Sequence, residues 1–197
     1  MGTLLMSNTA QAWPAHTMTA DEFLAWAAAY EGEEKLELID GHIVPKYTAM
    51  APETLKHHNI KVAVFDALRL AVKKAALPCD VLIDALAVRV SDNKTFIPDV
   101  TVRCGPTLDG NQREIPDPLI VVEILSPSTK NFDFSGKLQG YFQVPSVEHY
   151  IVIDPDKPLA VHFTRANQST LTAALASAGA LRLDPPGIAL DLSAIFG

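Results

Sequence analysis

Two carboxylates stand in segments whose other residues predict buried strands. Glu123 interrupts the apolar run 119–127 (LIVVEILSP), and Asp99 follows Pro98 within the run 95–104. Runs rich in valine and isoleucine that are bounded by prolines are typical of strands covered on both faces. An unpaired carboxylate there would cost several kcal/mol. Glu123 should therefore be protonated, paired, hydrogen-bonded or bound to a metal, unless it lies at a strand end partly in water.

Two acids on neighbouring strands can converge on one oxygen-rich site. Such a site suits Mg²⁺, which prefers carboxylate, carbonyl and water oxygens. The ion would stabilise negative charge on a phosphate and lower the pKa of its bound water. Lys137 lies on the next predicted helix, beside an apolar stripe. Taken alone, that position is more typical of a surface lysine whose stem covers apolar residues.

The N-terminal part of the chain predicts a helix followed by a hairpin. Residues 1–16 show no periodicity and are expected to form a flexible tail, whereas 19–22 (TADE) is a capping box that starts a helix ending near Tyr30. Asp40-Gly41 is a strong hairpin turn between the runs 35–40 and 42–44. Glu37 lies on the strand face opposite its apolar neighbours, which fits a solvated carboxylate or a functional one.

A long helix is expected from about Glu53 to Ala76. Its apolar residues recur with helical spacing, and His57 extends their stripe by one turn. A lone histidine at the start of a helix is more often a packed or capping residue than a ligand. His57 is therefore a secondary candidate for a site role.

From residue 80 onward the sequence predicts strands interrupted by one helix. A loop at 91–94 joins strands over 80–90 and 95–104 into a hairpin, and Pro98 suggests an edge or a bulge beside Asp99. The remaining expected elements are a loop over 105–118, a strand over 119–127, a helix ending near Val144, strands over 149–153 and 159–164, a weakly patterned segment over 166–180, and a packed tail over 188–196.

Bulk composition predicts one domain, over residues 17–197 of the 197. A net charge of −7 argues against a broad nucleic-acid surface, although a metal site needs its own acids. No apolar run approaches the length that spans a bilayer, and the first residues lack the features of a signal peptide. Cys79 and Cys104 lie in no zinc pattern, so reduced, mostly buried thiols and a cytoplasmic location are expected.

The order of these elements, with PDV (98–100) followed by VEIL (122–125), resembles the PD-(D/E)XK nuclease superfamily. More closely it resembles the Uma-type branch, a family of restriction-endonuclease-like proteins, over about residues 33 to 197. The matching pieces are ELIDG (37–41), His57, PDV (98–100), VEILSPST (122–129), Asp133 to Lys137, Tyr141, VEHYIVIDP (147–155) and PGIALDL (186–192). Each piece is weak alone, but their order and spacing together are specific.

The resemblance implies that Asp99, Glu123 and the Ile124 carbonyl hold Mg²⁺, for which Mn²⁺ can substitute. The superfamily lysine normally stands two residues after the glutamate, where this chain has Leu125. In the Uma-type branch a lysine on the next helix takes that place, which points to Lys137. Its ammonium would orient the attacking water or stabilise charge on the phosphate.

Two further residues enter through the same resemblance. Glu37 is similar to an acid that family members keep in the leading hairpin, and it is expected to complete the metal shell. His57 is an additional candidate. The implied fold is an α/β restriction-endonuclease-like core, in which a central mixed sheet is flanked by helices and preceded by a helix and a hairpin.

The expected function is Mg²⁺-dependent hydrolysis of DNA phosphodiester bonds by a homodimer, with no membrane association. Two alternatives stay open. One is a protein that keeps the nuclease fold with a weak or silent site and serves in nucleic-acid binding. The other is a subunit whose DNA-binding surface depends on an unknown protein partner, since the sequence shows no helix-turn-helix, zinc finger or basic arm.

Overall fold

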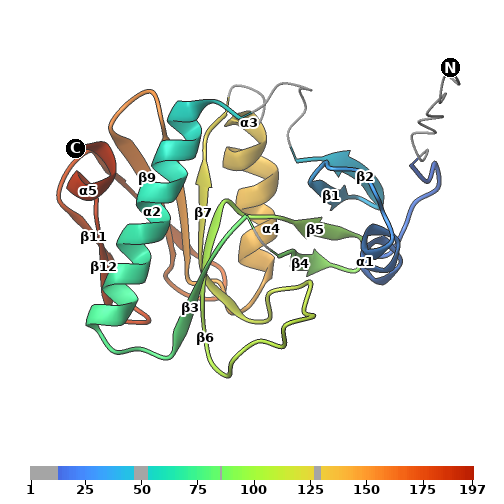
Figure 1. Ribbon diagram of the computed structural model, residues 1–197. Coiled ribbons are helices and arrows are strands. Elements are labelled where there is room, and N and C mark those ends of the chain that lie inside the picture. The colour runs from blue at the N-terminus through green and yellow to red at the C-terminus, as the bar shows by residue number, and fades with distance from the viewer. Residues whose placement is uncertain (1–12, 47–52, 85, 127–129) are drawn as a thin grey trace, which may run out of the picture.

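The computed structural model describes residues 13–46, 53–84, 86–126 and 130–197, which form two main sheets with helices packed against them (Figure 1). The expected tail over 1–16 lies mostly outside the described residues. The central sheet has the strand order β10-β9-β8-β7-β6-β3. Its strands are β3 (Cys79–Ile83), β6 (Val100–Cys104), β7 (Pro118–Ile124), β8 (His149–Asp154), β9 (Leu159–Arg165) and β10 (Leu171–Ala176).

The predicted strand that contains Glu123 is β7, which lies between β6 and β8 in the sheet. It pairs antiparallel with β6 and parallel with β8, so the sheet is mixed. Both faces of β7 are covered, as its continuous apolar sequence predicts. Val122 and Ile124 belong to the apolar cluster of one face, and Val121 belongs to the cluster of the other.

The smaller sheet has the strand order β2-β1-β5-β4. It comprises β1 (Leu36–Ile39), β2 (His42–Pro45), β4 (Val88–Ser91) and β5 (Lys94–Phe96). The predicted hairpin between β1 and β2 is present, and positive φ angles at Asp40 and Gly41 form its turn. The expected capping box starts α1 (Ala20–Ala28), whose Phe23 packs against Leu36 and Leu38.

The predicted hairpin over 80–104 is divided between the two sheets, which corrects the expectation of two long strands. Its outer ends pair as β3 and β6 in the central sheet, and its inner ends pair as β4 and β5 in the smaller one. The chain leaves the central sheet at Asp84, where φ is 46°. It returns after Pro98, which cannot donate to a strand ladder. Pro98 therefore marks the passage between sheets, and the irregular pairing of β6 with β7 lies further along, between Val102 and Arg103.

Helices cover both faces of the central sheet (Figure 1). On one face lies α2 (Leu55–Lys74), where Val64, Leu68 and Val72 enter the core as helical periodicity predicts. On the other face α3 (Lys130–Phe132), the π-helical turn η1 (Asp133–Lys137) and α4 (Leu138–Gln143) replace the single regular helix that was expected. Within the described ranges, no helix combines the length and apolarity needed to cross a membrane.

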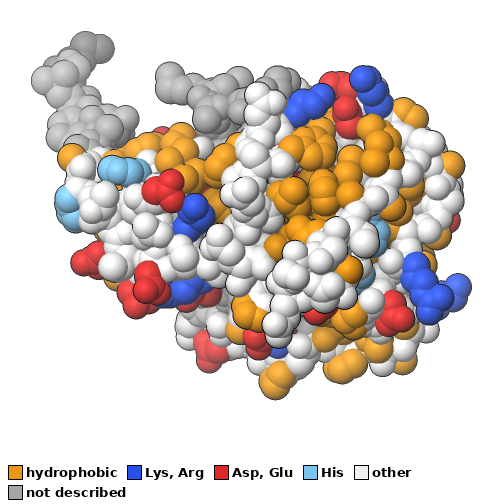
Figure 2. All heavy atoms as spheres, turned by 180° about the vertical axis from the view of Figure 1, so that it is seen from behind, with side chains coloured by type: hydrophobic (Ala, Val, Ile, Leu, Met, Phe, Trp, Pro, Cys, Tyr) orange, Lys and Arg blue, Asp and Glu red, His pale blue; other side chains and the backbone are white. Residues whose placement is uncertain are grey.

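The C-terminal residues form a separate hairpin on the α2 side of the sheet. It consists of β11 (Ala180–Leu183) and β12 (Ile188–Asp191), followed by α5 (Ser193–Phe196). Leu183 and Leu190 are fully buried in the α2 cluster, which confirms the packed tail. Part of the weakly patterned segment forms the edge strand β10, on which Leu175 is 70% exposed. The rear view shows a broad hydrophobic area on the surface (Figure 2).

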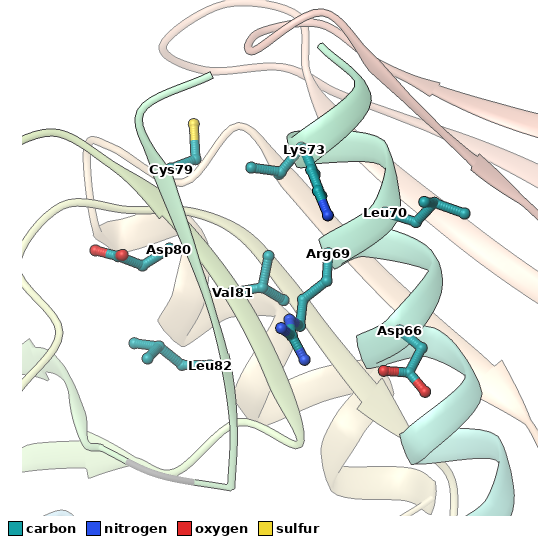
Figure 3. Close-up of a pocket in the computed structure, with 9 residues that line it drawn as sticks. Asp66, Arg69, Leu70, Lys73, Cys79, Asp80, Val81 and Leu82 are labelled. Carbon is teal, nitrogen blue, oxygen red and sulfur yellow. The ribbon is translucent and has the colours of Figure 1, made fainter. Parts of the chain in front are cut away.

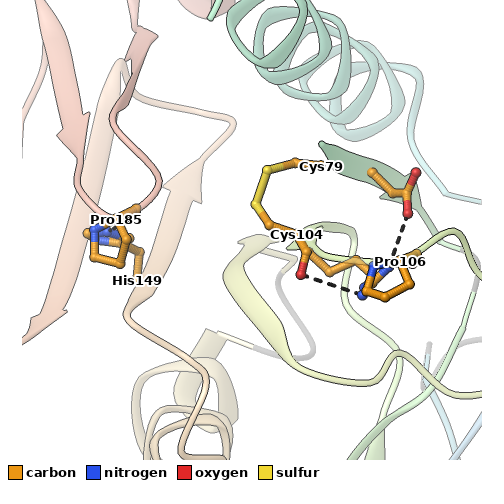
Figure 4. The surroundings of a disulfide bond; sticks show 7 residues. Cys79, Cys104, Pro106, His149 and Pro185 are labelled. Atoms are coloured by element: carbon orange, nitrogen blue, oxygen red, sulfur yellow. Dashed lines mark hydrogen bonds and ion pairs between the residues drawn. A yellow bond between two sulfur atoms is a disulfide. The ribbon is translucent and has the colours of Figure 1, made fainter. Parts of the chain in front are cut away.

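A disulfide joins Cys79 to Cys104, so the expectation of reduced thiols is wrong for this structure (Figure 4). The two residues lie directly opposite each other in the register of β3 and β6. Pairing of the strands brings together cysteines that are 25 positions apart and belong to no short motif. The neighbouring Arg103 donates to the Asp80 carboxylate and to the Pro106 carbonyl.

Two histidines pair inside the central sheet. The Nδ1 atom of His149 on β8 lies 3.0 Å from Nε2 of His162 on β9. His149 Nε2 lies 2.9 Å from the carbonyl oxygen of Pro185, and Figure 4 shows these two residues side by side. Burial lowers the pKa of His162 to about 4 and also lowers the pKa of His149. The unfolded chain therefore binds protons at a higher pH than the folded protein does.

We expect the His149–His162 pair to cost stability as pH falls from about 6.5 towards 4, the window set by the unfolded and folded pKa values of His162. The measurement is the free energy of unfolding by urea at several pH values. His162→Gln should lose less stability than the parent over this window, and His58→Gln, at an exposed position of α2, is the matched control. A His162→Gln profile that coincides with the parent profile would contradict this assignment.

Candidate active site

The ends of several elements meet around a small cavity of about 10 Å³. Its lining comes from the segment after β2, the first turn of α2, the start of β6, the end of β7 and the π-helical turn. The lining residues are Lys46, His57, Asp99, Glu123, Ile124, Ser126 and Lys137. Five of the six predicted site residues are among them, and the sixth, Glu37, lies behind Lys137.

Asp99 precedes β6 and is almost completely buried. Its Oδ2 atom accepts a hydrogen bond from the Ile124 amide at 2.7 Å, which ties the start of β6 to the end of β7. Its Oδ1 atom lies 2.7 Å from the Lys46 ammonium nitrogen. Burial acts to raise the pKa of Asp99, but Lys46 and His57 outweigh it and hold the pKa below its usual value.

Glu123 projects from β7 towards the π-helical turn and α4. Its Oε1 atom accepts hydrogen bonds from the Lys137 ammonium at 2.8 Å and from the Tyr141 hydroxyl at 2.7 Å. Burial, which Lys137 opposes, raises the pKa of Glu123 to about 8. The carboxyl group therefore binds a proton in the neutral pH range when no further cation is near it.

Lys137 points inward, and only 2% of its surface is exposed. Its ammonium lies 3.4 Å from Glu37 Oε1 and 3.8 Å from Asp133 Oδ1, in addition to its contact with Glu123. Burial acts to lower the pKa of Lys137, but these carboxylates outweigh it and raise the pKa above its usual value. Lys137 is therefore a charged donor at neutral pH. It belongs to a π-helical turn, a feature that is frequent at functional sites.

Glu37 and His57 support the site from opposite sides. The Glu37 carboxylate accepts a hydrogen bond from the Ile97 amide at 2.9 Å, so it connects β1 to the segment that leads into Asp99. The Nε2 atom of His57 lies 2.9 Å from the Ile124 carbonyl oxygen and 3.7 Å from Asp99 Oδ2. Glu37 reaches the cavity through Lys137, and His57 lines it directly.

A group of charged residues that the sequence analysis missed lies next to Asp99. Asp84, where the chain leaves the central sheet, contacts the ammonium groups of Lys35, Lys46 and Lys61. Lys61 also binds Glu53, and both lie near the start of α2. The spacing of Lys61 four residues after His57 places both on one helix face, which was an available signal. Nothing comparable marked Lys46 or Asp84, because both lie where the chain changes direction.

The donors around the cavity suit a hard cation. The carboxylates of Asp99 and Glu123 and the carbonyl of Ile124 all belong to residues that line it, and oxygen is the donor that Mg²⁺ prefers. Among the described residues, no group of three or more His, Cys, Asp or Glu side chains is arranged to hold a metal ion.

A larger cavity of about 520 Å³ lies elsewhere, between α2 and the edge strand β3 (Figure 3). Arg69 and Lys73 reach into it from the helix, and Asp80 and Leu82 line it from the strand. None of the predicted site residues lines this cavity. This cavity has the larger volume, but the buried acids and the lysine that are suited to chemistry line the smaller cavity.

Comparison with solved structures defines the class of fold. A crystal structure described as that of "a putative nuclease belonging to DUF820" from Anabaena variabilis ATCC 29413 matches with a TM-score of 0.68 over 91% of this chain and 97% of that one. The sequence identity is 20%, so the likeness concerns the fold. The fold of this chain is restriction-endonuclease-like, as the family resemblance implied.

The family model of Uma2, described as "Putative restriction endonuclease", matches residues 20–193. The chain belongs to the Uma2 family. Among curated proteins it is 28% identical to the uncharacterized protein slr1290 of Synechocystis sp. over 141 residues, which are 71% of this chain and 70% of that protein. It is 25% identical to the uncharacterized protein sll1609 of the same organism over 140 residues, which are 70% of this chain and 75% of that protein.

We expect the Glu123 carboxyl group of the metal-free protein to titrate near pH 8, which ¹³C NMR of labelled glutamate can follow. Tyr141→Phe removes a hydrogen bond to the charged form, so this pKa should rise further. Tyr150→Phe is the matched control, since the Tyr150 hydroxyl donates to the Asp133 carbonyl. A Glu123 pKa in the ordinary range of about 4 to 5 would refute the expected effect of burial.

Proposed function

We propose that this chain is a metal-dependent endonuclease that hydrolyses DNA phosphodiester bonds. The observation that carries the proposal is the buried Lys137 ammonium, 2.8 Å from Glu123 in the cavity that Asp99 and the Ile124 carbonyl also line. Membership in the Uma2 family supports a nuclease-like function. The chemistry of the cavity supports the dependence on a metal.

In this proposal Asp99, Glu123 and the Ile124 carbonyl hold Mg²⁺, or Mn²⁺ in its place. When bound, the ion supplies charge stabilisation at the phosphate and an acidic water. The chain itself orients the ligands. The Ile124 amide holds Asp99 from the strand side, and His57 contacts the Ile124 carbonyl oxygen from α2. Glu37 is proposed as an outer member of the same site that acts through Lys137.

Lys137 is proposed to take the part of the lysine that the superfamily carries on the strand. Leu125 occupies that strand position, and it is buried in the apolar cluster beneath α4. The Lys137 ammonium reaches Glu123 from the helix side instead. A charged donor held there can orient the attacking water or donate to a phosphate oxygen. The pKa of Lys137 is raised by Glu123, Glu37 and Asp133, which outweigh its burial.

We also propose that the protein acts on DNA as a homodimer in the cytoplasm, with or without a further protein partner. The Cys79–Cys104 disulfide is unusual for that compartment. Cell fractionation tests the location, and light scattering tests the oligomeric state.

The rival proposal is a silent nuclease-like protein that binds nucleic acid. The contact between Lys46 and Asp99 favours this rival, because in the metal-free protein an ammonium group already occupies the carboxylate proposed to hold the metal.

We expect Lys137→Met to lower DNA cleavage by a factor of roughly 10²–10³, the usual cost of losing one donor to the transition state. A plasmid-nicking assay with Mn²⁺ compares the parent with Lys137→Met and Asp99→Ala, and the latter should be inactive. Lys73→Met, at an exposed position of α2, is the control for loss of a lysine. Equal cleavage by the parent and Lys137→Met would remove Lys137 from the mechanism. If neither the parent nor any variant cleaves DNA with any metal, the result supports the rival proposal of a silent site.

Metal binding should stabilise the fold by mass action, by about 2.7 kcal/mol when the free metal is one hundred times its dissociation constant. Thermal unfolding with and without Mg²⁺ or Mn²⁺ measures the effect. Glu123→Gln should abolish it, whereas Glu33→Gln, at an exposed position, should keep it. A Glu123→Gln protein that responds to the metal as the parent does would remove Glu123 from the ligands.

A further inference from the structure

Lys46, directly after β2, places its ammonium between two carboxylates. The Nζ atom lies 2.6 Å from Asp84 Oδ1 and 2.7 Å from Asp99 Oδ1. The residue is buried, with 4% of its surface exposed, and it lines the cavity together with Glu123 and Lys137. Lys46 therefore contacts Asp99, a proposed metal ligand, at Oδ1, whereas the Ile124 amide donates to Oδ2.

The need for a cation at this point follows from the two acids. Asp84 and Asp99 both lie within hydrogen-bond distance of one nitrogen atom, so their charges repel each other strongly in a buried site. The pKa values of both are lowered despite burial, and Lys46 is the strongest charged contributor for each. The ammonium thus does for this pair what a metal ion would do.

Asp84 does not depend on Lys46 alone. Lys61 is buried against Asp84, and the half-exposed Lys35 lies 3.1 Å from the same carboxylate. Neither of these lysines has a described contact with Asp99 within 4 Å. Lys46 is therefore distinguished from its neighbours by the bond to Asp99, the carboxylate that the nuclease proposal assigns to the metal.

We propose that Lys46 is an internal competitor of the metal, a positioning residue that holds Asp99 Oδ1 in the metal-free protein and thereby lowers the affinity of the site for a divalent cation. A metal ion held by Asp99 would meet the Lys46 ammonium beside the same carboxylate, and the two positive charges would repel. Binding would therefore require Lys46 to withdraw towards Asp84. The inference rests on the proposed metal site.

The test is the dissociation constant of Mn²⁺ and Mg²⁺, measured by calorimetry and by Mn²⁺ electron paramagnetic resonance. Lys46→Gln keeps a polar side chain and removes the charge, so it should bind Mn²⁺ at least tenfold more tightly than the parent. Lys46→Arg keeps the charge and should bind no more tightly than the parent. Lys35→Gln removes a lysine that contacts Asp84 but not Asp99, and it should match the parent.

A merely structural lysine would give the opposite result, because its loss would loosen the site and weaken metal binding. Unchanged or weaker affinity in Lys46→Gln therefore overturns the proposal. If that variant does not fold, ¹⁵N NMR of the lysine ammonium groups in the parent decides. The Lys46 signal should shift when Mg²⁺ is added, and a signal that stays constant while metal binds overturns the proposal.

The outcome is separable from that of the nuclease proposal. A parent that binds metal but cleaves no DNA removes the nuclease function, and tighter binding by Lys46→Gln would still support the competition. A parent that cleaves DNA with a metal affinity unaffected by Lys46→Gln keeps the function and overturns the competition. If neither the parent nor Lys46→Gln binds metal, both the metal-dependent nuclease proposal and the competition by Lys46 fail. Binding by the variant alone supports complete exclusion of metal by Lys46.

Discussion

The cost of keeping a carboxylate on the central strand of a covered sheet determines much of the surrounding structure. Glu123 is 2% exposed, and neither apolar cluster of the sheet offers its carboxyl group a polar partner. The polar partners are Lys137 and Tyr141 on the helical side. Lys137 is itself too deeply buried to be left with one partner, and Glu37 joins it from the smaller sheet. One buried acid thus binds together the sheet, the π-helical turn and the N-terminal hairpin.

A second cluster of charged residues surrounds Asp99, and it too offsets the cost of a buried acid. Lys46 offsets Asp99 and Asp84 together, and Lys61 links Asp84 to Glu53 on α2. The two groups of charged residues meet at the cavity of about 10 Å³, which is lined by both lysines and acids. Paired in this way, the buried charges satisfy one another within the protein.

Most of the fold could be predicted from the sequence, because apolar periodicity, the capping box and the Asp40-Gly41 turn are local signals. Glu123 was found because it violates its own pattern, and Asp99 because it lies on a neighbouring predicted strand. The role of Lys137 followed from the family resemblance. Lys46 and Asp84 could not be found in this way, since their pairing exists only once the hairpin over 80–104 is divided between two sheets. The Cys79–Cys104 disulfide depends on strand register, which two isolated cysteines do not encode.

The passage of the chain between the two sheets has a consequence for biosynthesis. The candidate site draws on the smaller sheet, on α2, on both crossing points and finally on Lys137, so its members are spread over roughly half of the chain. No fragment that ends before Lys137 contains all of its members. A chain in which only one sheet has formed lacks either Asp99 and Glu123 or the charged partners that come from the smaller sheet. A growing polypeptide therefore completes the candidate site only after the π-helical turn has been synthesised.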